Sequence, residues 1–236
     1  MSSGAPPRQM AFDLAAAPRY GIEDFMVSES NEAAYAAIEA WPDWAAPWLM
    51  LIGPRGSGKS HIAAIWAQRA QARVVQAARL TVADAPALAG GPLAIDDADQ
   101  IGGHEAALFH LLNLARESGA PILFTAVSEP TAWGLTTPDL LSRLRLAPQV
   151  TLATPDDALM RAALVKLFVD RQLTVDVGVI ETLALHLDRS LDAARRVVEA
   201  LDGQSLALRR RITRAMARDA LAELGAGAQR TLFDEG

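Results

Sequence analysis

The sequence predicts an α/β domain with a mostly parallel five-stranded sheet, followed by a small all-helical domain. Apolar runs of strand length alternate with helical patterns up to about residue 154. From there to residue 224 the pattern is helical throughout. A glycine-rich segment, GPRGSGKS at 53–60, stands between the first apolar run and the next helical pattern. Parallel strands need crossover connections, so this alternation favours helices on both faces of the sheet.

The predicted strands are short runs of apolar and β-branched residues bounded by turn-forming residues. They cover residues 48–52, 73–77, 93–96, 121–127 and 149–153. The helices predicted within this region cover residues 31–40, 59–72 and 105–117. Ser30 or Asn31 caps the first of these helices, and Gly119 ends the last.

A change of pattern after Pro155 marks the predicted domain boundary. Four helical segments follow it without an intervening strand, at 156–173, 177–187, 191–202 and 207–224. The predicted organisation is a flexible arm at 1–20, the α/β domain at 21–154, a helical lid at 155–224 and a flexible tail at 225–236.

The composition excludes several classes of protein. The chain has 236 residues and no cysteine, which rules out disulfides, thiolate metal sites and a cysteine nucleophile. Its formal net charge of −6 argues against a protein that coats nucleic acid by charge alone. The first residues show no signal peptide, and the longest apolar stretch, 45–52, is too short to cross a bilayer. We therefore expect a soluble cytoplasmic protein that does not bind membranes.

Residues 53–60 fit the phosphate-loop pattern G-x-x-x-x-G-K-[S/T] at every fixed position. Glycines let backbone N–H groups approach phosphate oxygens, and the helix that follows adds its N-terminal partial charge. A glycine-rich turn without a ligand is the alternative. The pattern predicts that ADP or ATP binds with Mg²⁺, with Lys59 on the phosphates and Ser60 on the metal ion. The predicted nucleotide-binding residues here are Gly53, Arg55, Gly56, Ser57, Gly58, Lys59, Ser60 and His61.

A second acidic motif, LAIDDAD at 93–99, ends a predicted strand with two carboxylates. Asp96 is expected to hold the Mg²⁺ ion through water, together with Ser60. Asp97 is expected to act in catalysis by orienting an attacking water. The alternative for such a pair is a turn or a helix N-cap.

Together GPRGSGKSH, IDDAD, FTAVS (124–128) and DLLSRL (139–144) resemble the AAA+ ATPases of the DnaA clade, over roughly residues 20–222. The resemblance implies an AAA+ phosphate-loop domain followed by a helical lid. The segment at 25–37 is similar to the clade's linker beside the adenine, which places Val27 near the base. No helix-turn-helix pattern follows the lid, so within the clade the chain is similar to the Hda-like regulatory inactivators of DnaA.

Roles for three further residues follow from this resemblance. Arg143 matches the arginine finger that the clade presents to the nucleotide of a neighbouring subunit; the alternative is an ordinary surface salt bridge. Ser128 is expected to be the polar sensor after the fourth strand. Asp192 stands where the clade carries a second-sensor arginine. A carboxylate there would repel a γ-phosphate, which implies weak intrinsic ATPase activity and an ADP-bound resting state, unless Arg189, Arg195 or Arg196 substitutes.

The resemblance also implies a tether to the replication sliding clamp, the β subunit of DNA polymerase III. A clamp-binding peptide needs a glutamine followed by aliphatic and aromatic residues in an extended segment. The predicted tether near the N-terminus consists of Gln9, Met10, Phe12 and Leu14. Its alternative is that Phe12 and Leu14 pack against the α/β domain. A second candidate near the C-terminus consists of Gln229, Leu232 and Phe233.

Five arginines are predicted on the last helix: Arg209, Arg210, Arg211, Arg214 and Arg218. Arg211, Arg214 and Arg218 share one helix face, which could contact DNA or could be a solvated surface.

Two functions remain after these observations. The first is a regulator of replication initiation, tethered to the DNA-loaded clamp, that stimulates hydrolysis of DnaA-bound ATP in trans. The second is an autonomous AAA+ ATPase of the same clade, such as a helicase loader. The expected partners are DnaA, the clamp and, through the clamp, DNA; assembly of several copies of the chain is left open.

Overall fold

The computed structural model describes residues 25–234, with side-chain detail through residue 225. Five parallel strands form one sheet in the order β2-β3-β4-β1-β5. The strands are β1 (Trp48–Ile52), β2 (Arg73–Gln76), β3 (Leu93–Asp96), β4 (Ile122–Ala126) and β5 (Gln149–Thr151). The predicted α/β class with a five-stranded parallel sheet is confirmed.

The register brings the carboxyl ends of the strands to one edge of the sheet. Ile52 of β1 pairs with Ala126 of β4, and Gln76 of β2 pairs with Asp96 of β3. The loops that follow β1, β3 and β4 therefore lie next to one another. In open α/β sheets this edge is the usual location of a ligand site.

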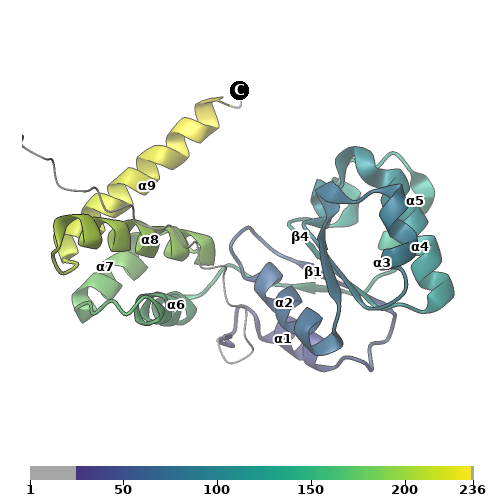
Figure 1. Cartoon of the computed structure of the whole chain (residues 1–236), viewed down its shortest axis with the longest axis horizontal. Helices are drawn as coiled ribbons and strands as arrows, with labels where there is room; N and C mark the ends of the chain where they lie inside the picture. The colour runs from purple at the N-terminus through teal and green to yellow at the C-terminus, as the bar shows by residue number, and fades with distance from the viewer. Residues whose placement is uncertain (1–24, 235–236) are drawn as a thin grey trace, which may run out of the picture.

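Helices cover both faces of the sheet (Figure 1). α1 (Glu32–Glu39) and α2 (Lys59–Ala70) pack on one face. The opposite face carries α3 (Ala85–Leu88), α4 (Glu105–Ser118) and α5 (Pro138–Leu144). The two cores are built by alternating residues of the same strands, as a sheet covered on both sides requires.

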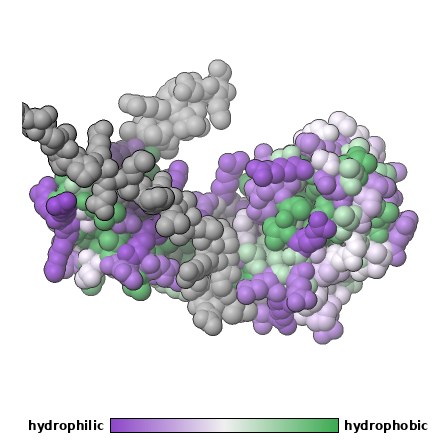
Figure 2. Space-filling model, viewed as in Figure 1, coloured by the Kyte–Doolittle hydropathy of each residue, from purple (hydrophilic) through white to green (hydrophobic). Residues whose placement is uncertain are grey.

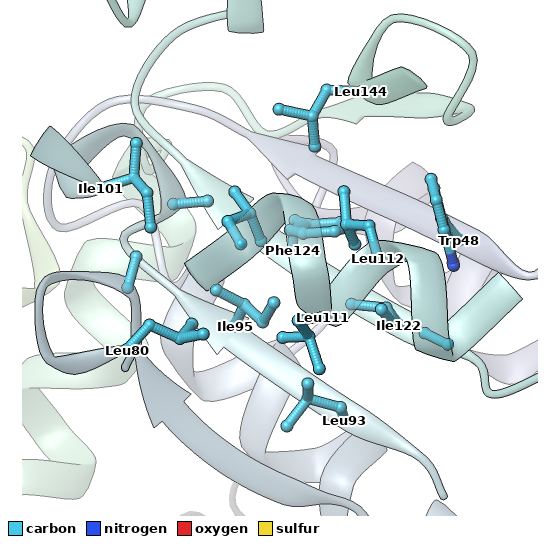
Figure 3. Close-up of a cluster of buried hydrophobic side chains, with 14 of the residues drawn as sticks. Trp48, Leu80, Leu93, Ile95, Ile101, Leu111, Leu112, Ile122, Phe124 and Leu144 are labelled. Atoms are coloured by element: carbon cyan, nitrogen blue, oxygen red, sulfur yellow. The ribbon is translucent and has the colours of Figure 1, made fainter. Parts of the chain in front are cut away.

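Strand β1 shows this alternation most clearly, because all of its residues are buried. Leu51 points to the α2 side, where Trp66 is fully buried. Met50 belongs to the opposite cluster, with Phe124 and Leu111. Figure 3 shows this second cluster, with the α4 leucines packed against Ile95 and Ile122 of the sheet. Burial of each large apolar side chain contributes about 1.5–3 kcal/mol.

The lid consists of α6 (Asp157–Asp170), α7 (Val177–His186), α8 (Leu191–Leu208) and α9 (Arg214–Asp234), around a hydrophobic core of its own. Asp156 caps α6 by accepting a hydrogen bond from the N–H of Leu159 at 2.8 Å. Ser190 caps α8 in the same way, with the N–H of Ala193 at 3.3 Å. Between residues 25 and 234, no helix combines the length and apolar content needed to cross a bilayer.

The last helix differs from its predicted course at both ends. It begins only at Arg214, so Arg209, Arg210 and Arg211 lie in the corner between α8 and α9. The chain turns there because Arg209 has φ 50°, in the left-handed region that ends a helix. At the other end, α9 continues to Asp234, past the predicted boundary at residue 224.

Candidate functional site

The loop at 53–58 joins β1 to α2 and contains two glycines in the left-handed region, Gly56 at φ 72° and Gly58 at φ 98°. A Cβ on Gly56 would lie 1.9 Å from Oγ of Ser190, and one on Gly53 would lie 2.6 Å from the carbonyl oxygen of Leu152. Side chains at these positions would therefore displace the lid or the neighbouring loop. The first N–H groups of α2, next to Gly58, have no partner within the helix and can bind an anion.

Two buried polar side chains of this loop fit a phosphate ligand. The Lys59 ammonium donates to the carbonyl oxygens of Gly53 at 2.7 Å and Pro54 at 2.9 Å. Burial lowers the pKa of Lys59, and nearby carboxylates, with Asp97 first, oppose that shift. The Ser57 hydroxyl is buried and has no hydrogen-bond partner among the described residues. A buried hydroxyl of this kind is costly unless a ligand or water satisfies it.

The carboxylate of Asp96, which is 8% exposed, is the most heavily bonded acidic group of the site. Its Oδ1 accepts from the Ser60 hydroxyl at 2.9 Å and from the Thr125 hydroxyl. Its Oδ2 accepts from Nε2 of Gln76 at 2.9 Å. A serine hydroxyl beside a fixed carboxylate is a set of hard oxygen donors of the kind that Mg²⁺ prefers.

Asp97 lies next to it with a strained backbone, at φ 51°. Its N–H donates to Oγ1 of Thr125 at 3.0 Å, so one buried hydroxyl holds both acidic residues. Burial, followed by the charges of Asp96 and Asp99, raises the pKa of Asp97. A carboxylate with a raised pKa is better able to accept a proton from water.

Part of the phosphate loop and Asp97 border a cavity of about 290 Å³ between the α/β domain and the lid. The predicted residues that line it are Arg55, Gly56, Gly58, Lys59, Ser60, His61 and Asp97. The lid contributes Leu191, Asp192 and Arg195, and the N–H of Leu191 donates to the carbonyl oxygen of Gly56 at 2.8 Å. Arg195 pairs with Asp192 at 3.1 Å, which offsets part of the negative charge that the sequence places there.

Several of the residues predicted around the nucleotide lie outside the lining of this cavity, namely Gly53, Ser57, Asp96, Val27 and Ser128. Val27 is 51% exposed. An aromatic cluster stands near it instead, in which Phe25 stacks on Tyr35 at 5.1 Å and meets His61 edge-on at 5.4 Å. Ser128 accepts a hydrogen bond on its carbonyl oxygen from Nε1 of Trp133 at 2.8 Å. The residue before it, Val127, lines the cavity.

Arg143 lies on α5, whose neighbour is α4, on the side of the α/β domain away from the lid (Figure 1). Its guanidinium stands over the ring of Phe109, 4.7 Å from the centroid, and donates to Oδ1 of Asn113. Both partners are neutral, and no carboxylate pairs with Arg143 in the part of the chain that the structure describes. The charge is therefore oriented without being neutralised.

The remaining predicted residues belong to the two terminal peptides. Gln9, Met10, Phe12 and Leu14 lie outside the described residues. The second candidate lies within α9, whose backbone is helical to Asp234, and its side chains are likewise outside the described part.

Sequence reasoning missed Thr125 and Gln76, which together with Ser60 hold the Asp96 carboxylate. Both stand at the carboxyl ends of strands next to β3, and this position is the signal that could have identified them. Polar side chains there point to the same edge as the phosphate loop.

Replacement of Thr125 by valine is expected to lower the free energy of unfolding by about 1–3 kcal/mol, because it leaves buried hydrogen-bonding groups unpaired. Denaturant unfolding measures this change.

The variant should also need more Mg²⁺ for nucleotide binding, whereas Thr125→Ser should restore the wild-type requirement. Thr151→Val, at an exposed position of β5, is the matched control. Equal Mg²⁺ requirements for wild type and Thr125→Val would exclude a role for Thr125 in the metal site.

No family model and no curated protein matches the chain in sequence. Solved structures match it in fold. Domain III of the replication initiation protein DnaA from Thermotoga maritima superposes with a TM-score of 0.74 at 21% identity, over 88% of this chain and 97% of that one. DnaA from Aquifex aeolicus bound to AMPPCP gives 0.63 at 20% identity, over 78% and 65%. A Thermotoga maritima RuvB mutant gives 0.68 at 17% identity, over 87% and 72%. The chain thus has the AAA+ fold that DnaA and RuvB share.

Proposed function

We propose that this protein is a nucleotide-bound, Hda-like regulator of replication initiation. Held by the DNA-loaded sliding clamp, it places Arg143 beside the ATP of DnaA and stimulates hydrolysis there. The observation that carries this proposal is the placement of Arg143: a charge held by neutral groups, on the side of its domain away from its own cavity. A guanidinium so placed can serve a nucleotide bound by another subunit.

The chain's own nucleotide is ADP or ATP with Mg²⁺. The unpaired Ser57 hydroxyl and the buried Lys59 support phosphate binding, and the solved AMPPCP complex of DnaA supports a nucleotide as the ligand. Ser60 and Asp96 would hold the metal ion, which neutralises phosphate charge when it is bound. Asp97 would orient a water molecule, and its raised pKa would help it to accept a proton from that water.

The cavity favours a diphosphate over a triphosphate in the resting state. Asp97, Asp99 and Asp192 line it alongside the cations Arg55 and Lys59, so the three carboxylates would oppose part of the attraction for a further phosphate group. Arg195 is already paired with Asp192 and therefore offers only part of its charge. We therefore expect a bound nucleotide mainly to stabilise the folded chain, with little energy supplied by its hydrolysis.

Replacement of Asp192 by arginine tests this preference. We expect the affinity for ATP relative to ADP to rise about threefold to tenfold, the range for a charge change at an exposed position that lines the cavity. Fluorescent nucleotide titrations give the ratio. Asp219→Arg, at an exposed position of α9, makes the same charge change elsewhere in the lid. If both variants shifted the ATP-to-ADP affinity ratio equally, local repulsion by Asp192 would not be the cause of the preference for ADP.

The tether proposed for the clamp is the N-terminal peptide with Gln9 and Phe12. The helical backbone of residues 229–233 supports this choice, because a peptide bound in extended form would require that end of α9 to unwind. Clamp pull-down with Gln9→Ala and Phe12→Ala, compared with Gln229→Ala and Phe233→Ala, decides between the two ends.

The second function, an autonomous ATPase of the same clade, is favoured by one observation. Arg195 faces the cavity from α8, where it could supply the cation that Asp192 does not. A reconstituted assay separates the two functions by measuring ATP turnover of the chain alone and of DnaA with clamp, DNA and the chain. Stimulated turnover that requires DnaA supports the regulator, whereas robust turnover by the chain alone supports the autonomous enzyme.

A further inference from the structure

The corner between α8 and α9 carries a cluster of exposed arginines. Its five members, the corner arginines, are Arg209, Arg210, Arg211, Arg214 and Arg218. The lid forms its ion pairs through other cations, namely Arg161, Lys166, Arg171, Arg189 and Arg195. Among the described residues, no carboxylate forms an ion pair with a corner arginine. Five neighbouring positive charges thus lie at exposed positions without a direct ion-pair partner.

The backbone of the corner is held by several hydrogen bonds. Arg209 adopts φ 50° at the end of α8, a conformation that costs a residue with a side chain about 1 kcal/mol more than glycine. The Ser205 hydroxyl donates to the carbonyl oxygen of Arg210 at 2.7 Å, and the N–H of Arg210 donates to the carbonyl oxygen of Ser205 at 3.3 Å. Ile212, which is 4% exposed, anchors the turn in the lid core.

The start of α9 continues this basic surface. Thr213 accepts a hydrogen bond from the N–H of Met216 at 3.3 Å and caps the helix. Arg214 and Arg218 follow one turn apart on the same face. Together with His186 and Glu181, whose carboxylate pairs with Arg161, they border a groove of about 450 Å³ on the lid. The Arg214 guanidinium lies over Gly178 there.

The charge of the whole chain makes this corner distinctive. The formal net charge is −6, so the chain as a whole repels a polyanion. Figure 1 places the corner at the end of the lid farthest from the α/β domain, and Figure 2 shows hydrophilic residues along the outer edge of that end. An extended polyanion can therefore reach the arginines while it stays clear of the acidic remainder.

We propose that the corner arginines bind the phosphate backbone of DNA without reading its sequence. Double-stranded DNA carries a negative charge for about every 1.7 Å of its axis. This dense row of phosphates complements a group of closely spaced cations better than a ligand with isolated carboxylates would. Guanidinium groups bind phosphate oxygens through two parallel hydrogen bonds. The surface is separate from the nucleotide cavity and from Arg143, so this binding does not depend on the function proposed above.

Fluorescence anisotropy of the full chain with a labelled 30-base-pair duplex tests the proposal. The dissociation constant of the wild type should rise with salt, and the logarithmic slope should correspond to about three to five phosphate contacts at roughly 0.9 per contact. The triple variant Arg210→Gln, Arg211→Gln, Arg218→Gln should bind at least about tenfold more weakly at low salt, with a slope reduced by about three. Arg214 is left unchanged because its guanidinium packs against Gly178.

The matched control is the triple variant Arg79→Gln, Arg116→Gln, Arg145→Gln, which makes the same change in net charge at exposed positions of the α/β domain, away from the corner. Equal weakening by both triple variants would show that binding follows net charge, and the proposal would be wrong. Wild-type binding to vesicles with anionic lipid, but not to the duplex, would also overturn it; the exposed Leu206 and Leu208 beside the corner are the reason for that comparison. The salt slope of the wild type needs no variant and gives an independent result.

Discussion

Replacement of Arg143 by alanine is expected to reduce stimulated hydrolysis of DnaA-bound ATP by about a thousandfold or more, the range for loss of an arginine finger. The cause is loss of a fixed positive charge as negative charge builds on the transferred phosphoryl group. Arg143→Lys should be almost as defective, since an ammonium lacks the planar fork that Phe109 and Asn113 hold. The measurement is single-turnover hydrolysis of radiolabelled ATP on DnaA with clamp and DNA.

Arg116→Ala on α4 is the control for this experiment, because it also removes an arginine from the same domain, at an exposed position. Nucleotide affinity should be unchanged in both variants, because Arg143 and Arg116 lie outside the cavity lining. Undiminished stimulation by Arg143→Ala would rule out the finger in trans. It would leave the DNA-binding proposal for the corner arginines intact, because that experiment uses neither DnaA nor nucleotide.

Replacement of Lys59 by alanine is expected to weaken nucleotide binding by the chain about a hundredfold. Lys59 already points its ammonium at two carbonyl oxygens of the loop, and a phosphate would replace these neutral acceptors by charged oxygens. Two hydrogen bonds of a charged donor contribute about 3 kcal/mol together, and about 1.4 kcal/mol corresponds to a factor of ten. Titration with a fluorescent ADP analogue measures the change.

The chain's other lysine, Lys166, is the natural control, since it lies on α6 and pairs with Asp170. Lys166→Ala should bind nucleotide as the wild type does. Because there are only these two lysines, mass spectrometry after amine acetylation gives a second measurement: nucleotide should protect Lys59 and leave Lys166 unaffected. Equal acetylation of Lys59 with and without nucleotide would argue against its contact with phosphate.

The strand runs and the phosphate loop could be predicted because each is a local pattern. WLMLI is buried on both faces and becomes the inner strand β1, and the motif after it forms the turn into α2. The last helix was harder to predict. Arginine has a good helix propensity, so nothing in ALRRRITR marks the left-handed residue at Arg209.

The finer parts of the site depend on tertiary contacts that no local pattern contains. Thr125 lies within an apolar run and reads as a core residue until the register places it against Asp96 and Asp97. The pairing of Asp192 with Arg195 could be anticipated from helical spacing, but their position on the cavity depends on how the lid meets the loop. The partners of Arg143 are also distant in sequence, some 30 residues away on α4.

The hydrogen bond between Leu191 and Gly56 attaches the start of α8 to the phosphate loop, so the helix connects that loop to the far end of the lid. The helix begins on the phosphate loop and, with 18 residues, ends about 27 Å away at the arginine corner. A tilt of about 10° at the loop end would move the far end by about 5 Å, because displacement scales with that length. A small tilt of α8 at the loop would thus become a larger displacement at the far end of the lid.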